Sequence, residues 1–134
     1  MTFQLRPDDI YRTGIPNVDE QHDQFVGLIV RFQSTSFTNT NDPQLTELAS
    51  QLLAYARLHF RTEESLMRLA NYAGLESHAA EHARILAELK ERAASLGSGQ
   101  ATRAQFVMFL WKWLVDHTNL EDKAMAAHLN TLDA

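Results

Sequence analysis

The sequence predicts an all-α protein, folded as an antiparallel up-down-up-down four-helix bundle with an N-terminal arm. Three observations lead to this prediction. Apolar residues recur with helical spacing in four segments, Pro, Gly and polar stretches separate these segments, and no competing strand pattern is seen. Because the connections are short, consecutive helices are expected to run antiparallel.

The arm and the first two helices follow from their apolar positions and start signals. The arm, residues 1–16, is expected to pack on the bundle through Phe3, Leu5, Ile10, Tyr11 and Ile15. A first helix over about 18–36 places four residues inward: Val18, Phe25, Ile29 and Phe32. Asp42 followed by Pro43 is a capping residue followed by a first-turn proline, so a second helix is expected over 43–71. Its inward residues are Leu45, Leu48, Leu52 and Tyr55.

Gly74 separates the second helix from the third, which is expected over 75–96 and carries Ile85, Leu86, Leu89 and Leu96. It stops at the run Gly97-Ser98-Gly99. Thr102, with Gln105 three residues later, resembles a capping box, so the fourth helix is expected over 102–130. Its inward residues are Phe106, Phe109, Leu110, Trp113, Leu114 and Leu120.

Composition limits the class of protein. A chain of 134 residues fits a single domain, 1–134, and can bury a core without covalent cross-links. The absence of cysteine excludes thiolate metal sites, iron–sulfur clusters and disulfides. The net charge of -5, with no basic stripe, argues against nucleic acid as a partner. The polar N-terminus does not look like a secretory signal, and no apolar run approaches the roughly 20 residues of a membrane span, so we expect a cytoplasmic protein.

The histidines are the informative feature. Five of the six interrupt the apolar stripes of the helices instead of lying on the polar faces: His22, His59, His78, His82 and His117. Glu63 shares this property, one turn after His59. A single histidine on an apolar face is usually a core residue bonded to backbone. Five buried imidazoles and a carboxylate need more partners than helix interiors offer, and a bound cation satisfies them all.

The predicted topology brings these residues together. In an antiparallel bundle, the start of the first helix lies beside the end of the second, the start of the third and the end of the fourth. All five imidazoles fall in those segments, so they converge in one half of the bundle. Imidazole and carboxylate ligands suit iron, zinc, copper or manganese. Five imidazoles are too many for one ordinary zinc site, so two metals that share carboxylates fit better.

The complete pattern resembles the hemerythrin family. The resemblance is carried by His59-xxx-Glu63, His78-xxx-His82 and His117-xxxx-Asp122, with His22 upstream in the run 19–22. The motif His59-Phe60 with Glu63-Glu64 and Met67, and the pair Trp113-Leu114 before His117, belong to it as well. It covers almost the whole chain.

The resemblance implies a cofactor and a ligand set. One iron would be bound by His78, His82 and His117, and a second iron by His22 and His59. Glu63 and Asp122 would bridge both irons together with an oxo or hydroxo group. O2 would bind reversibly at the open position of the second iron. Candidate O2-pocket residues are Phe25, Phe60, Trp113, Leu114 and Thr118.

Several positions leave alternatives open. Asp122 is five residues after His117, about 140° around a straight helix, so periodicity alone favours Glu121 as the ligand. Glu64 is expected to be solvated, and His128 to be non-ligating. Thr118 replaces an isoleucine that is common in the family, and its hydroxyl could admit water to the pocket.

The resemblance implies an oxygen carrier, store or delivery protein and not an enzyme. The alternatives are an oxygen or redox sensor, an iron reserve, a ferritin-like di-iron oxidase or ferroxidase, and a structural zinc bundle. Ferritin-like sites use Glu-x-x-His motifs, and this sequence has none. We expect a monomer whose partners are O2 and an O2-consuming acceptor protein of unknown identity.

Overall fold

The computed structural model describes residues 10–35 and 42–131, and all regular structure in these ranges is helical. The elements are α1 (Pro16–Ser34), α2 (Pro43–Leu69), α3 (Leu75–Ala94), the short 3-10 turn η2 (Leu96–Ser98), α4 (Gln100–His117), the π-helical turn η3 (Thr118–Asp122) and α5 (Lys123–Thr131). The predicted helices are confirmed, with boundaries that differ by one or two residues at most ends.

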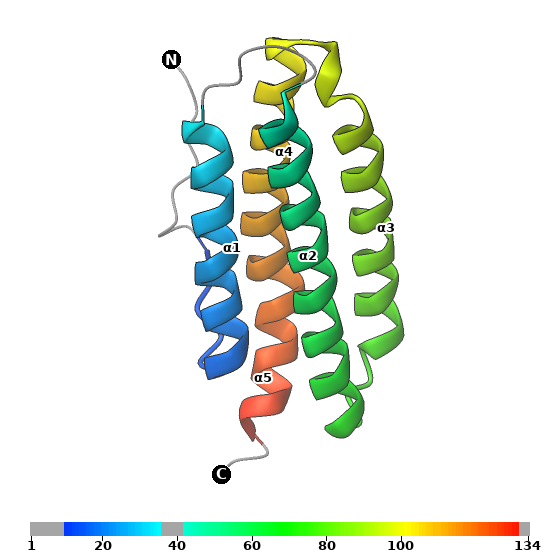
Figure 1. Cartoon of the computed structure of the whole chain (residues 1–134). Helices are drawn as coiled ribbons and strands as arrows, with labels where there is room; N and C mark the ends of the chain where they lie inside the picture. Colours follow the sequence, from blue (N-terminus) through cyan, green and yellow to red (C-terminus); the bar gives the residue numbers. More distant parts are fainter. Residues whose placement is uncertain (1–9, 36–41, 132–134) are drawn as a thin grey trace, which may run out of the picture.

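The helices form an antiparallel bundle (Figure 1). α1 packs against α2 and α4, and α3 packs against the same two helices, so each helix has two neighbours around a common axis. α4, η3 and α5 follow one another without a break and together make the fourth helix of the bundle. This is the up-down-up-down arrangement that the sequence predicts.

The starts of the helices follow two different rules. The Asp42 side chain accepts a hydrogen bond of 2.9 Å from the backbone N–H of Gln44, and Pro43 occupies the first turn of α2, as predicted. The predicted capping box at Thr102 is wrong, because α4 begins at Gln100. Gly99 precedes it at φ 140°, a conformation that residues with a Cβ rarely adopt, and the chain therefore enters the helix two residues earlier.

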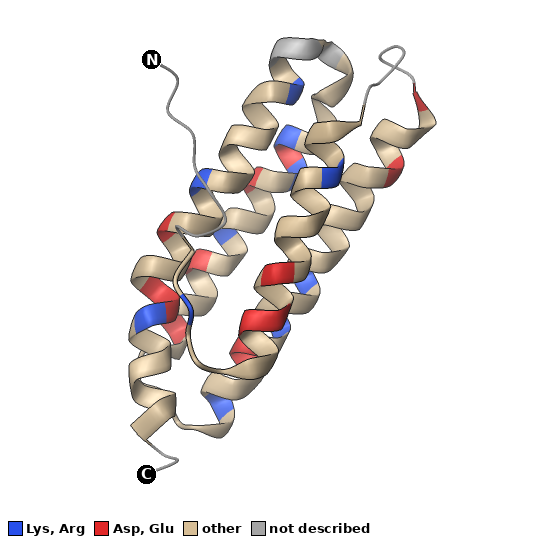
Figure 2. Ribbon diagram, turned by 90° about the vertical axis from the view of Figure 1, so that its left-hand side faces the viewer, with Lys and Arg blue, Asp and Glu red and all other residues tan. Residues whose placement is uncertain are grey.

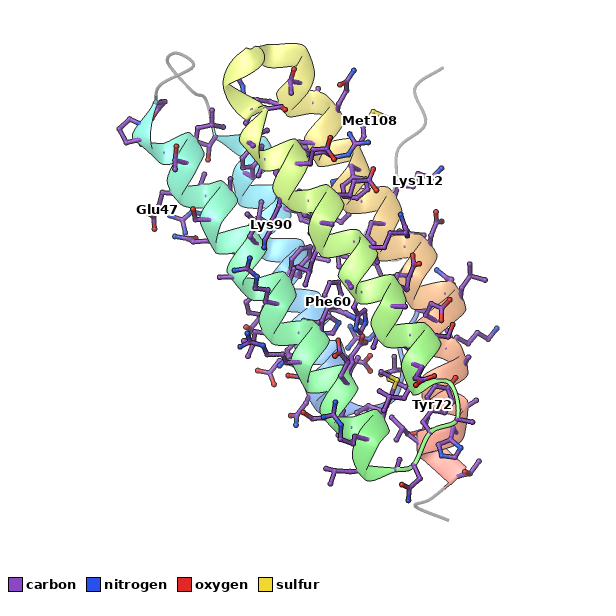
Figure 3. All side chains as sticks on the ribbon, turned by 90° about the vertical axis from the view of Figure 1, so that its right-hand side faces the viewer. Glu47, Phe60, Tyr72, Lys90, Met108 and Lys112 are labelled. Atoms are coloured by element: carbon purple, nitrogen blue, oxygen red, sulfur yellow. The ribbon has the colours of Figure 1, made fainter. Side chains whose placement is uncertain are left out.

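The buried side chains form three layers along the bundle axis. A large apolar cluster fills one part of the interior and includes Ile29, Leu52 and Leu89. A small apolar cluster of Val18, Met67 and Met125 closes the other end. On every helix, the histidines of the sequence pattern fall between these two clusters. Phe60, which lies inside the bundle in Figure 3, belongs to the large cluster at its border with the polar layer.

Leu120 is an exception to the apolar pattern. Periodicity places it inward, but 71% of its surface is exposed. It lies within η3, where the residue spacing departs from that of an α-helix. The expectation that Leu120 is a core residue is therefore wrong, and the reason is the local change of helix type.

A buried carboxylate on α1 accepts several hydrogen bonds from the described part of the arm. Asp19 accepts hydrogen bonds from the backbone N–H and the hydroxyl of Thr13, both 2.8 Å, and from the N–H of Gly14 at 3.0 Å. Ile10 is buried in the large apolar cluster, and Ile15 packs against the small one. Phe3 and Leu5, also predicted to pack the arm, lie outside the described residues.

The described helices have ordinary charged surfaces. On the face drawn in Figure 2, Lys and Arg alternate with Asp and Glu instead of forming one continuous basic stripe. Among the described residues, no helix is both long and apolar enough to cross a bilayer.

We predict that Asp19→Ala lowers the free energy of unfolding by about 2 kcal/mol, because it removes a charged acceptor from three donors. Urea denaturation of the metal-free protein measures this loss. Asp23→Ala is the matched control, since it breaks only the exposed ion pair with Arg12 and should cost less. Equal losses in both variants would show that Asp19 does not hold the arm.

Candidate metal centre

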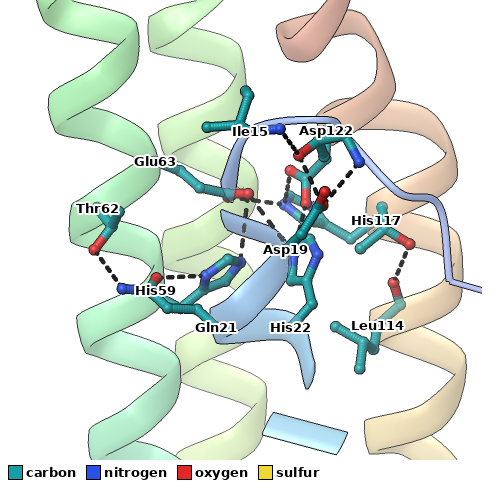
Figure 4. A network of polar contacts seen from close by, with 12 residues as sticks. Ile15, Asp19, Gln21, His22, His59, Thr62, Glu63, Leu114, His117 and Asp122 are labelled. Carbon is teal, nitrogen blue, oxygen red and sulfur yellow. Dashed lines mark hydrogen bonds and ion pairs between the residues drawn. The ribbon is translucent and has the colours of Figure 1, made fainter. Parts of the chain in front are cut away.

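The polar layer between the two apolar clusters consists of seven side chains drawn from all four helices of the bundle. Each is at most 4% exposed: His22, His59, Glu63, His78, His82, His117 and Asp122. The structure therefore brings together all five histidines that interrupt the apolar stripes, together with both carboxylates of the predicted ligand set. Figure 4 shows His22, His59 and His117 of this cluster, arranged around Glu63 and Asp122. The predicted convergence in one half of the bundle is confirmed.

Regular helix geometry positions most of these side chains. His59 and Glu63 are one turn apart on α2, and their Nε2 and Oε2 atoms lie 3.4 Å from each other. His78 and His82 stand one turn apart at the start of α3, with ring centroids 4.6 Å apart. Their direction toward the bundle axis follows from the apolar stripe that continues beyond them.

Asp122 reaches the layer because the helix changes type. Residues 118–122 form a π-helical turn, whose i→i+5 hydrogen bonds bring residues five apart onto the same face. Asp122 Oδ1 consequently lies 3.0 Å from His117 Nε2. Glu121, which periodicity favours on a straight helix, is partly exposed and takes no part in the cluster. Of the two carboxylates, the structure places Asp122 in the site.

Three imidazoles present their Nε2 atoms to one point. The Nε2 of His117 lies 3.2 Å from that of His78 and 3.1 Å from that of His82. Metal–nitrogen bonds of about 2.1 Å at right angles would separate two nitrogens by about 3.0 Å. The spacing of the three nitrogens is thus what a shared cation requires, and such a cation would satisfy all their lone pairs.

The two carboxylates divide the layer into two groups. Glu63 Oε1 lies 2.9 Å from His82 Nε2 and 3.5 Å from His78 Nε2, whereas its Oε2 lies 3.4 Å from His59 Nε2. Asp122 is divided in the same way. Its Oδ1 lies 3.1 Å from His78 Nε2, and its Oδ2 lies 3.2 Å from His22 Nε2.

Each carboxylate therefore offers one oxygen to each group. The first group comprises Glu63, His78, His82, His117 and Asp122, and the second comprises His22, His59, Glu63 and Asp122. Within each group, the potential ligand atoms all lie within 4.8 Å of one another. Within the described part of the chain, all four buried carboxylate oxygens lack a hydrogen-bond donor, which is costly unless a cation neutralises them.

Two residues outside the predicted set contact the histidines from behind. Glu64 Oε2 lies 2.9 Å from His82 Nδ1, and Gln21 Oε1 lies 2.9 Å from His59 Nδ1. The expectation that Glu64 is only solvated is wrong: its side chain is 27% exposed and reaches back to the imidazole. In the sequence, these two contacts are indicated only by the position of each residue next to an inward-facing one: Gln21 precedes His22, and Glu64 follows Glu63.

In the polar layer, the imidazoles and the carboxylates stabilise each other's charged forms. Burial alone would lower the pKa of His78, but its contacts with Asp122 and Glu63 raise that pKa to about 9. The pKa of His117 is raised against burial to about 10 by the same two carboxylates. Burial and the charge of Glu63 oppose ionisation of Asp122, yet the neighbouring imidazoles hold its pKa at about 2. Without a metal, the layer therefore takes up protons in its place.

Apolar and aromatic side chains border the layer on one side. The Phe60 ring stacks on His82 with centroids 4.0 Å apart, and Trp113 meets both Phe60 and Phe25 edge to face at 5.4 Å. Leu114 is buried in the same apolar cluster. Of these four residues, Phe60 and Trp113 contact histidine rings directly. The role of all four as a pocket for O2 stays a prediction.

Thr118 is the fifth candidate pocket residue, and its hydroxyl already has backbone partners. It donates to the carbonyl of Leu114 at 2.8 Å and accepts from the N–H of Tyr11 at 3.3 Å. This helps to hold the arm against the fourth helix. The hydrogen bonds give the hydroxyl a structural use, and nothing in the contacts requires it to admit water.

His128 lies outside the cluster. Its Nε2 is 3.1 Å from the carbonyl oxygen of Ala70, and its ring packs on Tyr72. Neither of the two groups of potential metal ligands includes it.

Comparison with known proteins places the chain in a family. Residues 13–129 match the family model described as the hemerythrin HHE cation binding domain. The chain is 26% identical to the bacteriohemerythrin of Methylococcus capsulatus, covering 84% of this chain and 86% of the relative, and 28% identical to the myohemerythrin of Riftia pachyptila, covering 82% and 81%. A crystal structure of wild-type hemerythrin superposes with a TM-score of 0.78 at 22% identity, covering 96% of this chain and 97% of the other.

We predict that Asp122→Ala sharply reduces metal binding, whereas Glu121→Ala leaves it unchanged, because only Asp122 is turned into the site by the π-helical turn. Metal content after equilibration with ferrous iron under argon measures both variants. The opposite ranking, with Glu121→Ala as the damaging change, would show that the fourth helix is regular through this segment.

We also predict that metal binding to the apo-protein releases protons. The raised pKa values of His78 and His117, about 9 and about 10, lie above pH 7, so both imidazoles are protonated at that pH in the apo-protein. A metal must therefore displace about two protons, and its affinity falls as the pH is lowered. Calorimetric titration with zinc in two buffers of different ionisation enthalpy measures the number released. Binding with no proton release at pH 7 would contradict the assignment.

Proposed function

Because the chain belongs to the hemerythrin family, we propose that it binds O2 reversibly at a pair of iron ions and serves as an oxygen carrier, store or delivery protein. The observation that carries the proposal is the division of Glu63 and Asp122 between two groups of imidazoles. A single metal would leave one oxygen of each carboxylate unpaired in a buried layer. Two metals use all of them.

The two groups supply different numbers of ligands. The first group offers five side chains that would hold one metal. The second group offers four, so the metal that it would hold has one protein ligand fewer and more room for a small molecule beside His22 and His59. That inequality supports binding of one small molecule at the second metal.

When bound, the two ferrous ions supply the electrons with which O2 is held, and they recover them on its release. The protein's part is to keep water, protons and reductants away while this happens. The side chains of Phe25, Phe60, Trp113 and Leu114 are buried. The ring of Phe60 stacks on His82, and the ring of Trp113 stacks on His117. An environment of this kind favours release of an intact molecule over its chemical reduction.

The family and its relatives support an oxygen-binding role over an enzymatic one. Five of the seven clustered side chains are imidazoles, and only two are carboxylates. Ferritin-like di-iron enzymes instead use a carboxylate-rich site built from glutamates and Glu-x-x-His motifs. We therefore place the oxidase and ferroxidase alternatives below reversible binding.

We predict that the iron-loaded, reduced protein takes up about one O2 per metal pair and gives it back under vacuum. Iron analysis, absorption spectra and oxygen electrode readings taken over repeated cycles measure this. His59→Gln is expected to abolish reversible uptake, because it removes one of the two imidazoles of the second group. Steady consumption of O2 by the wild-type protein, with a substrate oxidised, would establish the oxidase alternative instead.

A further inference from the structure

Two of the five clustered imidazoles are supported from behind, one in each group. His82 Nδ1 contacts Glu64, and His59 Nδ1 contacts Gln21. The corresponding Nδ1 atoms of His22, His78 and His117 are buried and have no hydrogen-bond partner within the described part of the chain. Among the described residues, only one imidazole in each group therefore has a side-chain partner at Nδ1. That partner is a carboxylate in the five-residue group and a neutral amide in the four-residue group.

The contact with Glu64 fixes the proton of His82. An ionised carboxylate only accepts hydrogen bonds, so the Nδ1 of His82 must be the donor across the 2.9 Å contact. A neutral ring with its proton on Nδ1 has a lone pair on Nε2. That atom faces Glu63 and His117, where a metal would sit.

A chain of hydrogen bonds fixes His59 in the same way. The Thr62 hydroxyl donates to the carbonyl of Leu58 at 3.1 Å, so it must accept from the Gln21 amide nitrogen, also at 3.1 Å. The amide oxygen of Gln21 then faces His59 and accepts from Nδ1 (Figure 4). His59 consequently also directs a lone pair on Nε2 into the layer.

The two supports differ by one negative charge. A carboxylate behind an imidazole makes it a more basic and stronger metal ligand, and a neutral amide orients the ring with a smaller effect. Building on the proposed metal pair, we propose that Glu64 is a positioning residue that strengthens the five-ligand group through His82, whereas Gln21 orients His59 without added charge. The difference keeps the two metals unequal in how tightly they are held.

Isosteric charge exchange tests this inference. Ferrous titrations against a chromogenic chelator under argon give the stepwise affinities of the wild-type protein, Glu64→Gln and the double variant Gln21→Glu with Glu64→Gln. Glu47→Gln is the matched control, because it removes the same charge from an exposed position of the same helix. The double variant keeps the net charge of the wild type and moves the carboxylate from one group to the other.

We expect Glu64→Gln to weaken the tighter step by about 10-fold or more, with Glu47→Gln unchanged. In the double variant, the more weakly held ferrous ion should also bind more tightly, so that the two stepwise affinities differ less than in the wild type. If the affinity of the tighter binding step is the same in Glu64→Gln as in Glu47→Gln, the inference is overturned, but the proposal of a metal pair is unaffected. If the wild-type protein does not bind two ferrous ions, the proposed function fails, and the inference fails with it.

A spectroscopic readout separates positioning from general stability. In the zinc-loaded protein, ¹⁵N–¹H correlation spectra of the histidine rings should show a protonated Nδ1 for both His59 and His82. Glu64→Gln should keep that signature, because an amide oxygen still accepts, and Glu64→Leu should change it at His82 alone. A wild-type spectrum with Nδ1 of His82 unprotonated would overturn the proposed role of Glu64.

Discussion

The burial of two carboxylates is the constraint on which the rest of this structure depends. Glu63 and Asp122 are 0% exposed, and an ionised carboxylate removed from water is very costly unless cations or strong donors surround it. The five imidazoles, arranged around these groups, can meet the requirement either by carrying protons or by sharing metals. The apolar clusters on both sides keep water out and strengthen every charge interaction between them. Folding, proton uptake and metal binding are for this reason one coupled equilibrium.

The bundle and most of the layer could be predicted because a regular helix converts sequence spacing into direction. Apolar periodicity gave four helices, and the phase of His59 and Glu63 within it placed both side chains inward. Asp122 could not be found in this way, since a π-helical turn changes the phase within a few residues and its presence depends on local backbone hydrogen bonds. A resemblance to known proteins selected it where periodicity favoured Glu121. The early start of the fourth helix at Gln100 is not predicted for a related reason, because a backbone conformation open to Gly99 replaces the predicted side-chain cap.

The contacts behind the histidines mark a second limit of sequence reasoning. Periodicity assigns a residue to a face of its helix, but a long side chain at the edge of that face can still reach inward. Glu64 and Gln21 both do this, and each remains partly exposed. Thr118 shows the converse, since a hydroxyl that the sequence suggests for a pocket is hydrogen-bonded to backbone groups instead. The role of a residue at the boundary of a buried layer therefore depends on side-chain contacts that helical periodicity does not specify.

The three layers of the interior also bear on how this chain can be altered. All seven clustered side chains lie toward the end of the bundle that holds the turn from α2 to α3, whereas the turn from α3 to α4 is at the opposite end (Figure 1). The large apolar cluster stands between that far turn and the histidines. A peptide tag or a whole domain inserted at that turn would be separated from the seven clustered side chains by the large apolar cluster. The turn from α3 to α4 is thus a suitable position for fusing or inserting a second polypeptide without disturbing the clustered histidines and carboxylates.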